Sequence, residues 1–399
     1  MAATRDAAAD ARTADVLLQK ARALAPKLRE RADATGKARR IPDETIQDFW
    51  SAGLWYLLKP KKFGGSELRP DVALSVANEL ARADGSAGWV WAVMTIHDLL
   101  VALWPEEFQK EYWAKNTLSA SSFAPTGKAA PANGGYKISG KWTFSSGIDN
   151  ADWLLLGVFF GPPSGGSPIP DIRYVMLPKG DYKVIDDWFV FGLRGSGSKG
   201  VLVEDVFVPN HRICGLGEMI QGTTPGSKVH DSPLYKASVW GIIPFTISSP
   251  ANGMARGGLD AFLEDMKVRE GSYDHSPLSK KPGMHLVVAE ASAMIDAAEL
   301  LYRRSFTETI DKIMAGEALS LEHRARSRRD QGWSVMTARL AADKLFAAQA
   351  GRGIYEGNRV QRAFADVHAL QGHIVAGWDM PAYSYGQVML GGPPSDPFT

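Results

Sequence analysis

The segment from Trp142 to Gly147 combines aromatic and hydroxyl side chains in a pattern that suits a planar, polar ligand. It reads Trp-Thr-Phe-Ser-Ser-Gly, so two aromatic rings precede the hydroxyl groups of Ser145 and Ser146. Aromatic rings stack against flat molecules, and a serine hydroxyl both donates and accepts hydrogen bonds. The same residues also fit a strand that ends in a turn, with Trp142 in the core. The segment is therefore a candidate binding site.

Two histidines in apolar surroundings are candidates for acid–base chemistry. His97 lies within Met-Thr-Ile-His-Asp, and His373 follows Gln371 and Gly372. Histidine changes charge near neutral pH, so it can take a proton from an acidic hydroxyl group. The alternative is a buried structural histidine that only satisfies hydrogen bonds. The other histidines and the single cysteine, Cys214, show no metal-ligand spacing, so we expect no metal site.

The composition is that of a soluble globular protein. Of the 399 residues, 45% are hydrophobic and 22% are charged, and 45 Lys and Arg residues balance 44 Asp and Glu residues. This balance gives no electrostatic bias toward nucleic acid or a membrane surface. Glu322 and Asp330 flank the basic run Arg324–Arg329, as expected for a solvated helix face. We find no signal peptide and no apolar run of about 20 residues, so we expect a cytoplasmic protein.

The chain divides into three regions with different patterns. The first is rich in Ala, Leu, Glu and Arg, and Asp71–Ala83 places apolar residues with helical spacing. The second has short apolar runs between Gly, Pro, Asn and Ser clusters, and Asn133-Gly134 predicts a hairpin turn. The third contains long helical patterns. We predict an α+β fold with an N-terminal helical domain (1–117), a central β-barrel or sandwich (118–225) and an antiparallel four-helix bundle (226–399).

Several local phrases occur in an order that resembles the acyl-CoA dehydrogenase fold, over nearly the whole chain. They are Gly53-Leu54 followed by Phe63-Gly64-Gly65, Glu79 to Ser86, Gly192 to Ser198, and Glu204 to Pro209. No single phrase is decisive, but their occurrence in the correct order is a strong signal. The resemblance implies the same helical, β and helical architecture that the sequence patterns predict.

Within that fold, the chain resembles the two-component flavin monooxygenases, such as the oxygenase components of 4-hydroxyphenylacetate 3-hydroxylase and of the steroid-catabolic phenol hydroxylase. The Ser-Gly pair of Trp142–Gly147 stands where dehydrogenases usually have Trp-Ile-Thr-Asn. Dehydrogenases also need a carboxylate base, often in a Tyr-Glu-Gly-Thr phrase near the C-terminus. Here Tyr355-Glu356-Gly357 comes too early, before the family-like run Arg362–Asp366, and His373 follows that run instead.

The resemblance implies that reduced FMN or FAD reacts with O2 to form a C4a-hydroperoxyflavin, which hydroxylates a phenolic or related small aromatic substrate. A separate NAD(P)H-dependent flavin reductase would supply the reduced flavin, since the chain has no NAD(P)H-binding motif. A homotetramer is implied, with a dimer as the alternative. Other functions remain open: S- or N-oxygenation by the same fold, which would tolerate loss of His97, an acyl-CoA dehydrogenase, and a non-enzymatic helical binding protein.

The resemblance also implies roles for individual residues. His97 would bind the substrate hydroxyl and take its proton, with Ser121 or Ser122 beside it. His373 would lie near the reacting edge of the flavin, and Ser146 would hold the proton on flavin N5. The implied catalytic residues are His97, His373 and Ser146. The implied flavin contacts are Trp142, Phe144, Ser145, Ser146, Arg269, Gly351 and Gly353, with Arg269 near the phosphates and the two glycines close to the cofactor of a neighbouring subunit.

Overall fold

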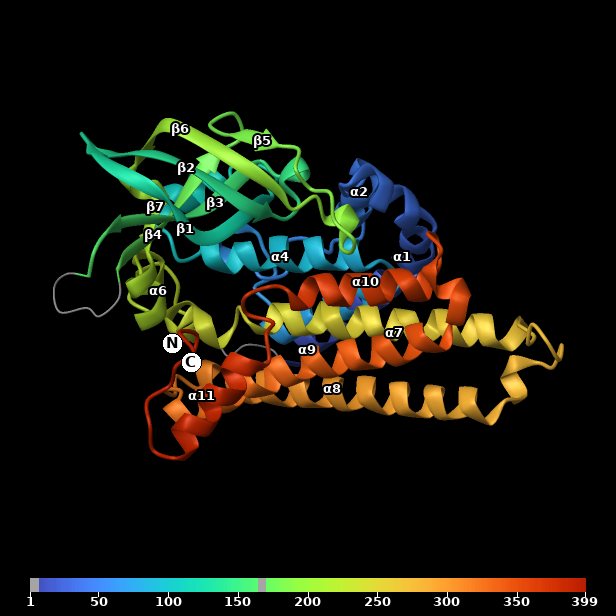
Figure 1. Cartoon of the computed structure of the whole chain (residues 1–399). Coiled ribbons are helices and arrows are strands. Elements are labelled where there is room, and N and C mark those ends of the chain that lie inside the picture. Colours follow the sequence, from blue (N-terminus) through green and yellow to red (C-terminus); the bar gives the residue numbers. More distant parts are fainter. Residues whose placement is uncertain (1–6, 164–169) are drawn as a thin grey trace.

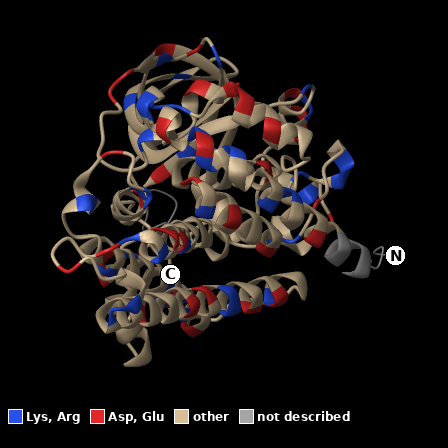
Figure 2. Ribbon diagram, turned by 90° about the vertical axis from the view of Figure 1, so that its right-hand side faces the viewer, with Lys and Arg blue, Asp and Glu red and all other residues tan. Residues whose placement is uncertain are grey.

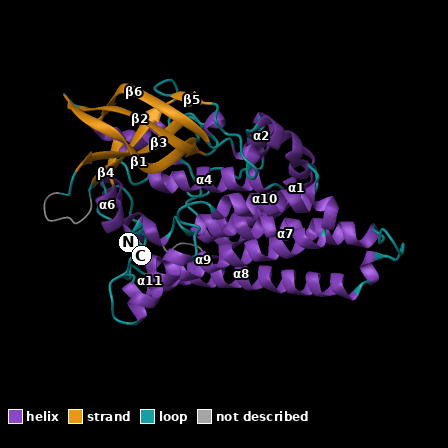
Figure 3. Ribbon diagram, in the orientation of Figure 1, coloured by secondary structure: helices purple, strands orange, loops and turns teal. Residues whose placement is uncertain are grey.

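The computed structural model describes residues 7–163 and 170–399, which form three parts (Figure 1). Helices make up the N-terminal and C-terminal parts, and the strands are gathered in the middle part (Figure 3). No described helix is long and apolar enough to cross a membrane. Basic and acidic residues are intermixed over the ribbons visible in Figure 2. This mixing agrees with the near-equal numbers of the two kinds of charge.

The N-terminal part contains α1 (Ala7–Ala38), α2 (Asp43–Ser51), α3 (Pro70–Ala83), α4 (Gly85–Val101) and α5 (Glu106–Tyr112). Helix α4 is apolar and buried along nearly its whole length, as expected for a helix packed between two layers. Asp84 separates α3 from α4, and its carboxylate accepts the backbone N–H of Ser86 as an N-cap. The cap defines where α4 begins and so which side chains it presents to each layer.

The middle part is a mixed sheet with the strand order β5-β6-β2-β1-β3-β4-β7. Its strands are β1 (Ser119–Ala132), β2 (Gly135–Ser145), β3 (Trp153–Gly161), β4 (Asp171–Pro178), β5 (Lys183–Ile185), β6 (Lys199–Pro209) and β7 (Ile213–Gly215). Strands β1 and β3 are parallel, and the other described pairs are antiparallel. The predicted turn Asn133-Gly134 joins β1 to β2, with Gly134 at a φ of +79°. The region predicted to form a β-barrel or sandwich therefore folds as this mixed sheet.

The C-terminal part contains α6 (Leu216–Gln221), α7 (Phe245–Val268), α8 (Pro282–Met314), α9 (Leu321–Ala348), α10 (Arg359–Gln371) and α11 (Asp379–Met389). The long helices α7, α8 and α9 lie side by side with α10 above them, and α4 lies between this bundle and the sheet (Figure 1). Large side chains such as Phe262, Tyr302 and Phe306 fill the bundle core and are at most 1% exposed. The predicted helical bundle is confirmed.

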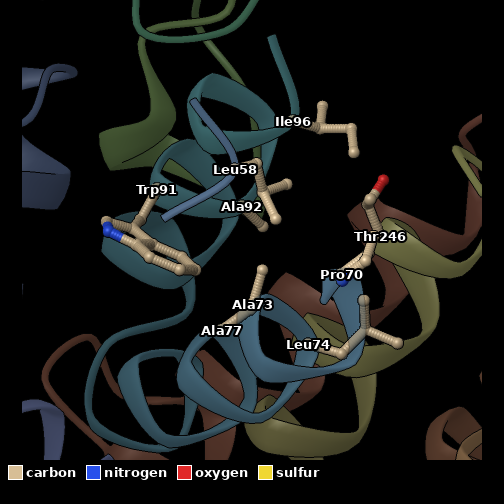
Figure 4. A pocket seen from close by; sticks show the side chains of 9 residues that line it. All are labelled: Leu58, Pro70, Ala73, Leu74, Ala77, Trp91, Ala92, Ile96 and Thr246. Carbon is tan, nitrogen blue, oxygen red and sulfur yellow. The ribbon is translucent and has the colours of Figure 1, made fainter. Parts of the chain in front are cut away.

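One side of α4 faces a small apolar pocket in the helical layer (Figure 4). Its lining residues come mainly from α3 and α4 and are Leu58, Pro70, Ala73, Leu74, Ala77, Trp91, Ala92, Ile96 and Thr246. The Thr246 hydroxyl donates to the Ile243 carbonyl, and the Trp91 indole donates to the Leu54 carbonyl. Because these polar groups are satisfied within the protein, the pocket offers no reactive group. The chemistry lies on the other side of α4, toward the sheet.

Candidate active site

The end of β2 meets the first turns of α4 at Gly147. This glycine has a φ of +74°, and a Cβ atom there would lie 2.5 Å from the Met94 side chain and 2.8 Å from that of Val90. Glycine is required here both by the backbone conformation and by the close packing. The approach brings the preceding residues, Ser145 and Ser146, against α4.

Ser146 belongs to a buried chain of hydroxyl groups. The Trp89 indole N–H donates to Ser146 Oγ at 3.0 Å, and Ser198 Oγ lies 2.7 Å from the same atom. Ser196 Oγ lies 2.7 Å from Ser198 Oγ. All four side chains are at most 6% exposed. The local sequence motif marks Ser146 but not its partners, because Trp89 and the two other serines reach it from distant segments of the chain.

His373 contacts the same tryptophan. The ring centroids of His373 and Trp89 are 5.7 Å apart in an edge-to-face arrangement. The backbone N–H of Val375 donates to His373 Nδ1 at 3.3 Å, so Nε2 carries the proton in the neutral ring. Burial lowers the pKa of His373 to about 4. At neutral pH the ring is therefore uncharged and offers Nε2–H as a donor.

His97 lies two turns further along α4 and is fully buried. Its Nδ1 is 2.7 Å from the carbonyl oxygen of Ser119, which can only accept, so Nδ1 carries the proton. Nε2 then has a free lone pair, and Ser121 Oγ donates to it at 2.9 Å. Burial lowers the pKa of His97 to about 4. The neutral imidazole and the Ser121 hydroxyl thus form a relay that can accept a hydrogen bond from a ligand.

The structure places Ser121, and not Ser122, beside His97. Neighbouring residues of a strand point to opposite sides of it, so the two serines cannot share one role. Ser122 Oγ donates to the carbonyl oxygen of Thr143 on the adjacent strand at 2.8 Å. The Phe123 ring lies 6.4 Å from the His97 ring, edge to face. The sequence alone does not decide between the two serines, because it does not show which side of β1 faces α4.

Comparisons with known proteins identify the family. Residues 13–121 match the N-terminal domain of acyl-CoA dehydrogenases, and residues 245–378 match the C-terminal domain. The chain is 36% identical to HsaA of Rhodococcus jostii, the oxygenase subunit of a flavin-dependent monooxygenase, over 95% of this chain and 99% of HsaA. This chain belongs to the flavin-dependent monooxygenases of the acyl-CoA dehydrogenase fold.

The names of two further relatives of this chain specify reduced FAD. The oxygenase component of an FADH2-dependent resorcinol hydroxylase from a Rhizobium species is 34% identical, over 91% of each chain. The solved structure of XiaF from a Streptomyces species, in complex with FADH2 and glycerol, superposes with a TM-score of 0.89. That match has 25% sequence identity and covers 99% of this chain and 100% of XiaF.

One predicted flavin contact needs correction. Trp142 is 1% exposed, and its indole N–H donates to the carbonyl oxygen of Gly157 at 2.8 Å. The expected contact between this indole and the flavin does not fit this position, because the ring is enclosed within the β-domain. Phe144 is 66% exposed and has a φ of +64°. Ser145 Oγ is buried without a hydrogen-bond partner among the described residues. These two side chains remain candidates for contact with the flavin.

A second group of predicted flavin contacts lies at the C-terminal end of α7. Arg269 Nη1 donates to Asp265 Oδ2 at 2.8 Å and to Gln349 Oε1 at 2.9 Å. Arg269 Nε and Gln349 Nε2 are buried and have no hydrogen-bond partner among the described residues. Gly351 is exposed, whereas Gly353 is buried against Gln349. Two unpaired donors beside an exposed glycine fit an anionic group such as a flavin phosphate.

Proposed function

We propose that this chain is the oxygenase component of a two-component monooxygenase that hydroxylates a phenolic or related aromatic substrate with reduced FMN or FAD and O2. A separate NAD(P)H-dependent reductase supplies the reduced flavin. The observation that carries the proposal is the buried His97–Ser121 pair, which can accept a hydroxyl proton. His97 lies on the same helix as Trp89, which contacts both Ser146 and His373.

The relatives support this substrate class. The Rhizobium relative hydroxylates resorcinol, a phenol, and is named as an oxygenase component that depends on FADH2. HsaA is named as an oxygenase subunit, which implies a second protein that reduces the flavin. The chain spans nearly the full length of both relatives.

On the substrate side, the substrate hydroxyl donates to Ser121 Oγ, and Ser121 donates to His97 Nε2. The lowered pKa of about 4 keeps His97 unprotonated before the substrate binds. When the substrate proton moves onto Ser121, the Ser121 proton moves onto Nε2, and the resulting phenolate raises the pKa of the neighbouring histidine. The phenolate ring is richer in electrons than the phenol ring and reacts faster with an electrophilic oxygen.

On the cofactor side, bound reduced flavin supplies the reactive oxygen atom from O2. Ser146 and Trp89 would hold the flavin ring, while Arg269 and Gln349 would hold a phosphate. His373 offers a neutral Nε2–H donor near the ring. Trp89 and Ser146 are buried, and their exclusion of water from the ring would limit the loss of activated oxygen as H2O2.

The His97–Ser121 pair also favours phenols over the substrates of an S- or N-oxygenating enzyme. A thioether or a tertiary amine has no hydroxyl proton for Ser121 to accept. We therefore propose ring hydroxylation ahead of heteroatom oxidation.

The test uses chemically reduced FMN and FAD in place of the reductase. The protein is mixed anaerobically with reduced flavin and then with O2 and one of three substrates: a phenol, its methyl ether or an aryl thioether. We expect a hydroxylated product from the phenol and much less product from the ether. Oxidation of the thioether alone would support the heteroatom alternative. The proposal is wrong if no substrate is oxidised and no absorbance distinct from reduced and oxidised flavin appears transiently.

A further inference from the structure

The loop Gly192–Ser198, here called the serine loop, connects three parts of the active site. Its backbone is hydrogen-bonded to each of them: Gly195 N donates to Ser86 Oγ of α4 at 3.1 Å, and Leu193 N donates to Asp366 Oδ1 of α10 at 2.6 Å. Ser196 O accepts from Gly147 N at 2.9 Å. The loop is thus attached to the start of α4, to α10 and to the residue that follows Ser146. Its two serine hydroxyls are held in fixed positions behind Ser146.

The hydrogen bonds of Ser146 show what Ser198 does. A serine hydroxyl donates one hydrogen bond and accepts two. The Trp89 indole N–H, which can only donate, uses one acceptor position of Ser146. Ser198, at 2.7 Å, uses either the hydrogen of Ser146 or its second lone pair. Ser146 therefore presents an acceptor to a ligand when it donates to Ser198, and a donor when Ser198 donates to it.

We propose that Ser198 is a positioning residue that sets the orientation and the donor or acceptor character of Ser146 toward the flavin ring. The inference rests on the proposed function, in which Ser146 faces flavin N5. Reduced flavin carries a hydrogen on N5 and needs an acceptor, which Ser146 supplies while it donates to Ser198. Oxidised flavin has no hydrogen on N5, and Ser146 then donates to N5 while Ser198 donates to Ser146.

The change between these two arrangements needs only rotation of O–H bonds. Ser196, the last hydroxyl of the chain, accepts from Ser198 in one arrangement and donates to it in the other. No heavy atom moves, and each arrangement contains the same number of hydrogen bonds. Hydroxyl chains of this kind also strengthen one another, since each bond polarises the next. We therefore expect the effects of substitution to decrease from Ser146 to Ser198 to Ser196.

The experiment measures the dissociation constant of reduced flavin under anaerobic conditions, which requires no turnover. Ser198→Ala is expected to weaken binding by about tenfold, the usual effect of leaving one buried hydroxyl without its partner. Ser198→Cys keeps nearly the same volume with a poor hydrogen-bonding group and should behave like Ser198→Ala. Ser198→Thr keeps the hydroxyl and should restore most of the affinity. Ser196→Ala is the matched control, and its effect should be smaller.

A double-mutant cycle separates positioning from a general structural role. If Ser198 acts through Ser146, Ser198→Ala should have little further effect on the dissociation constant in a Ser146→Ala background. A full additional loss in that background would overturn the inference, as would unchanged affinity in both Ser198→Ala and Ser198→Cys. Failure of Ser198→Thr to recover affinity while its unfolding temperature stays at the wild-type value would also overturn it.

The wild-type protein distinguishes this inference from the proposed function. If wild type binds reduced flavin but oxidises no aromatic substrate, the proposed reaction is wrong, whereas the cycle of binding constants still decides the role of Ser198. If wild type does not bind reduced flavin, both are wrong. The H2O2 released per flavin oxidised is a second measurement, and it should rise in Ser198→Ala because a poorly held flavin loses its activated oxygen.

Discussion

His97 is held in one tautomer by two hydrogen bonds, and this defines what it can do for a substrate. Nδ1–H donates to the Ser119 carbonyl and Nε2 accepts from Ser121. Replacement by glutamine removes the basic nitrogen, so we predict that His97→Gln lowers kcat/KM for a phenol by roughly a hundredfold at pH 7, at the low end of the range for general bases. The loss should shrink as the pH approaches about 10, where a phenol ionises without help. Steady-state kinetics between pH 6 and 10 give the result.

The pH dependence of kcat/KM in His97→Gln tests whether His97 acts as a base. A purely structural role of His97 would give the same loss at every pH at which the protein is folded. The role as a base must be abandoned if His97→Gln and wild type keep a constant ratio of kcat/KM over that range. Circular dichroism at each pH serves as the control for folding.

Ser121 and Ser122 form a matched pair of neighbouring serines with different hydrogen-bond partners. Ser121 donates to His97, whereas Ser122 donates to the Thr143 carbonyl. We predict that Ser121→Ala raises KM for a phenol and lowers kcat, because the relay to the histidine is interrupted. Ser122→Ala should change neither constant by more than about twofold, as for most substitutions away from a reacting group. Equal losses in the two variants would show that β1 does not present Ser121 to the substrate.

Local sequence motifs identify some residues of the candidate site but not all of them. Ser146, His97 and His373 stand in recognisable local phrases, so their candidacy followed from the sequence. Trp89 lies in an apolar run that looks like ordinary core, and Ser198 lies in a phrase whose chemistry was unassigned. Their contact with Ser146 depends on the approach of β2 to α4 at Gly147. No local pattern encodes an approach between segments so far apart in the chain.

At the scale of elements, the contact between α10 and the serine loop depends on a buried carboxylate. Asp366 accepts from Leu193 N at 2.6 Å, and burial raises the pKa of Asp366 to about 7 despite this bond and the nearby Arg362. Burial also raises the pKa of the neighbouring Asp84 to about 6. A carboxyl group whose folded pKa exceeds its unfolded value of about 4 favours folding less as the pH rises between those values. Ionisation of Asp366 therefore lowers the free energy of unfolding progressively as the pH rises from about 4 to about 7.

We predict that Asp366→Asn removes part of this dependence. The amide oxygen still accepts from Leu193 N, but it carries no charge to bury. The variant should show a flatter free energy of unfolding between pH 4 and 7, and it should be at least as stable as wild type at pH 8. Denaturant unfolding at several pH values measures both quantities. An unchanged slope would mean that Asp366 is not the group that titrates, and Asp84→Asn would then be the variant to examine.

The elements themselves were largely predictable, but their arrangement in the sheet was not. Helical spacing predicted Asp71–Ala83, and α3 covers Pro70–Ala83. Asn133-Gly134 predicted the β1–β2 turn, because two adjacent strands and their turn form a local unit. The parallel pairing of β1 with β3 and the place of β6 beside β2 depend on contacts between distant residues. The local sequence pattern of a strand does not indicate which other strand it pairs with.

At the scale of the whole molecule, the two groups of predicted flavin contacts lie far apart in one chain. Met254 of α7 packs beside Gly85 at the start of α4, near Trp89 and Ser146. Arg269 follows 15 residues later along the same helix, about 22 Å at 1.5 Å per residue. Figure 1 shows this end of α7 pointing away from the sheet. The distance favours an arrangement in which Arg269 of one subunit holds the phosphate of a flavin whose ring lies against Ser146 of another.

Mixing two variants that each bind flavin weakly tests this arrangement. We predict that Ser146→Ala and Arg269→Ala subunits, each with weak flavin binding alone, recover flavin binding when unfolded together and refolded as a mixed oligomer. If each site takes Ser146 and Arg269 from different subunits, random mixing leaves about a quarter of the sites intact in a closed symmetric assembly. If one subunit supplies both residues, no intact site forms and the mixture binds no better than the separate variants. The double variant Ser146→Ala/Arg269→Ala, mixed with either single variant, is the control, because the mixture then contains no subunit with one of the two residues. Recovery in the first mixture and none in the controls would place the flavin site between subunits, so that dissociation of the oligomer would abolish flavin binding without any change in the fold of the chain.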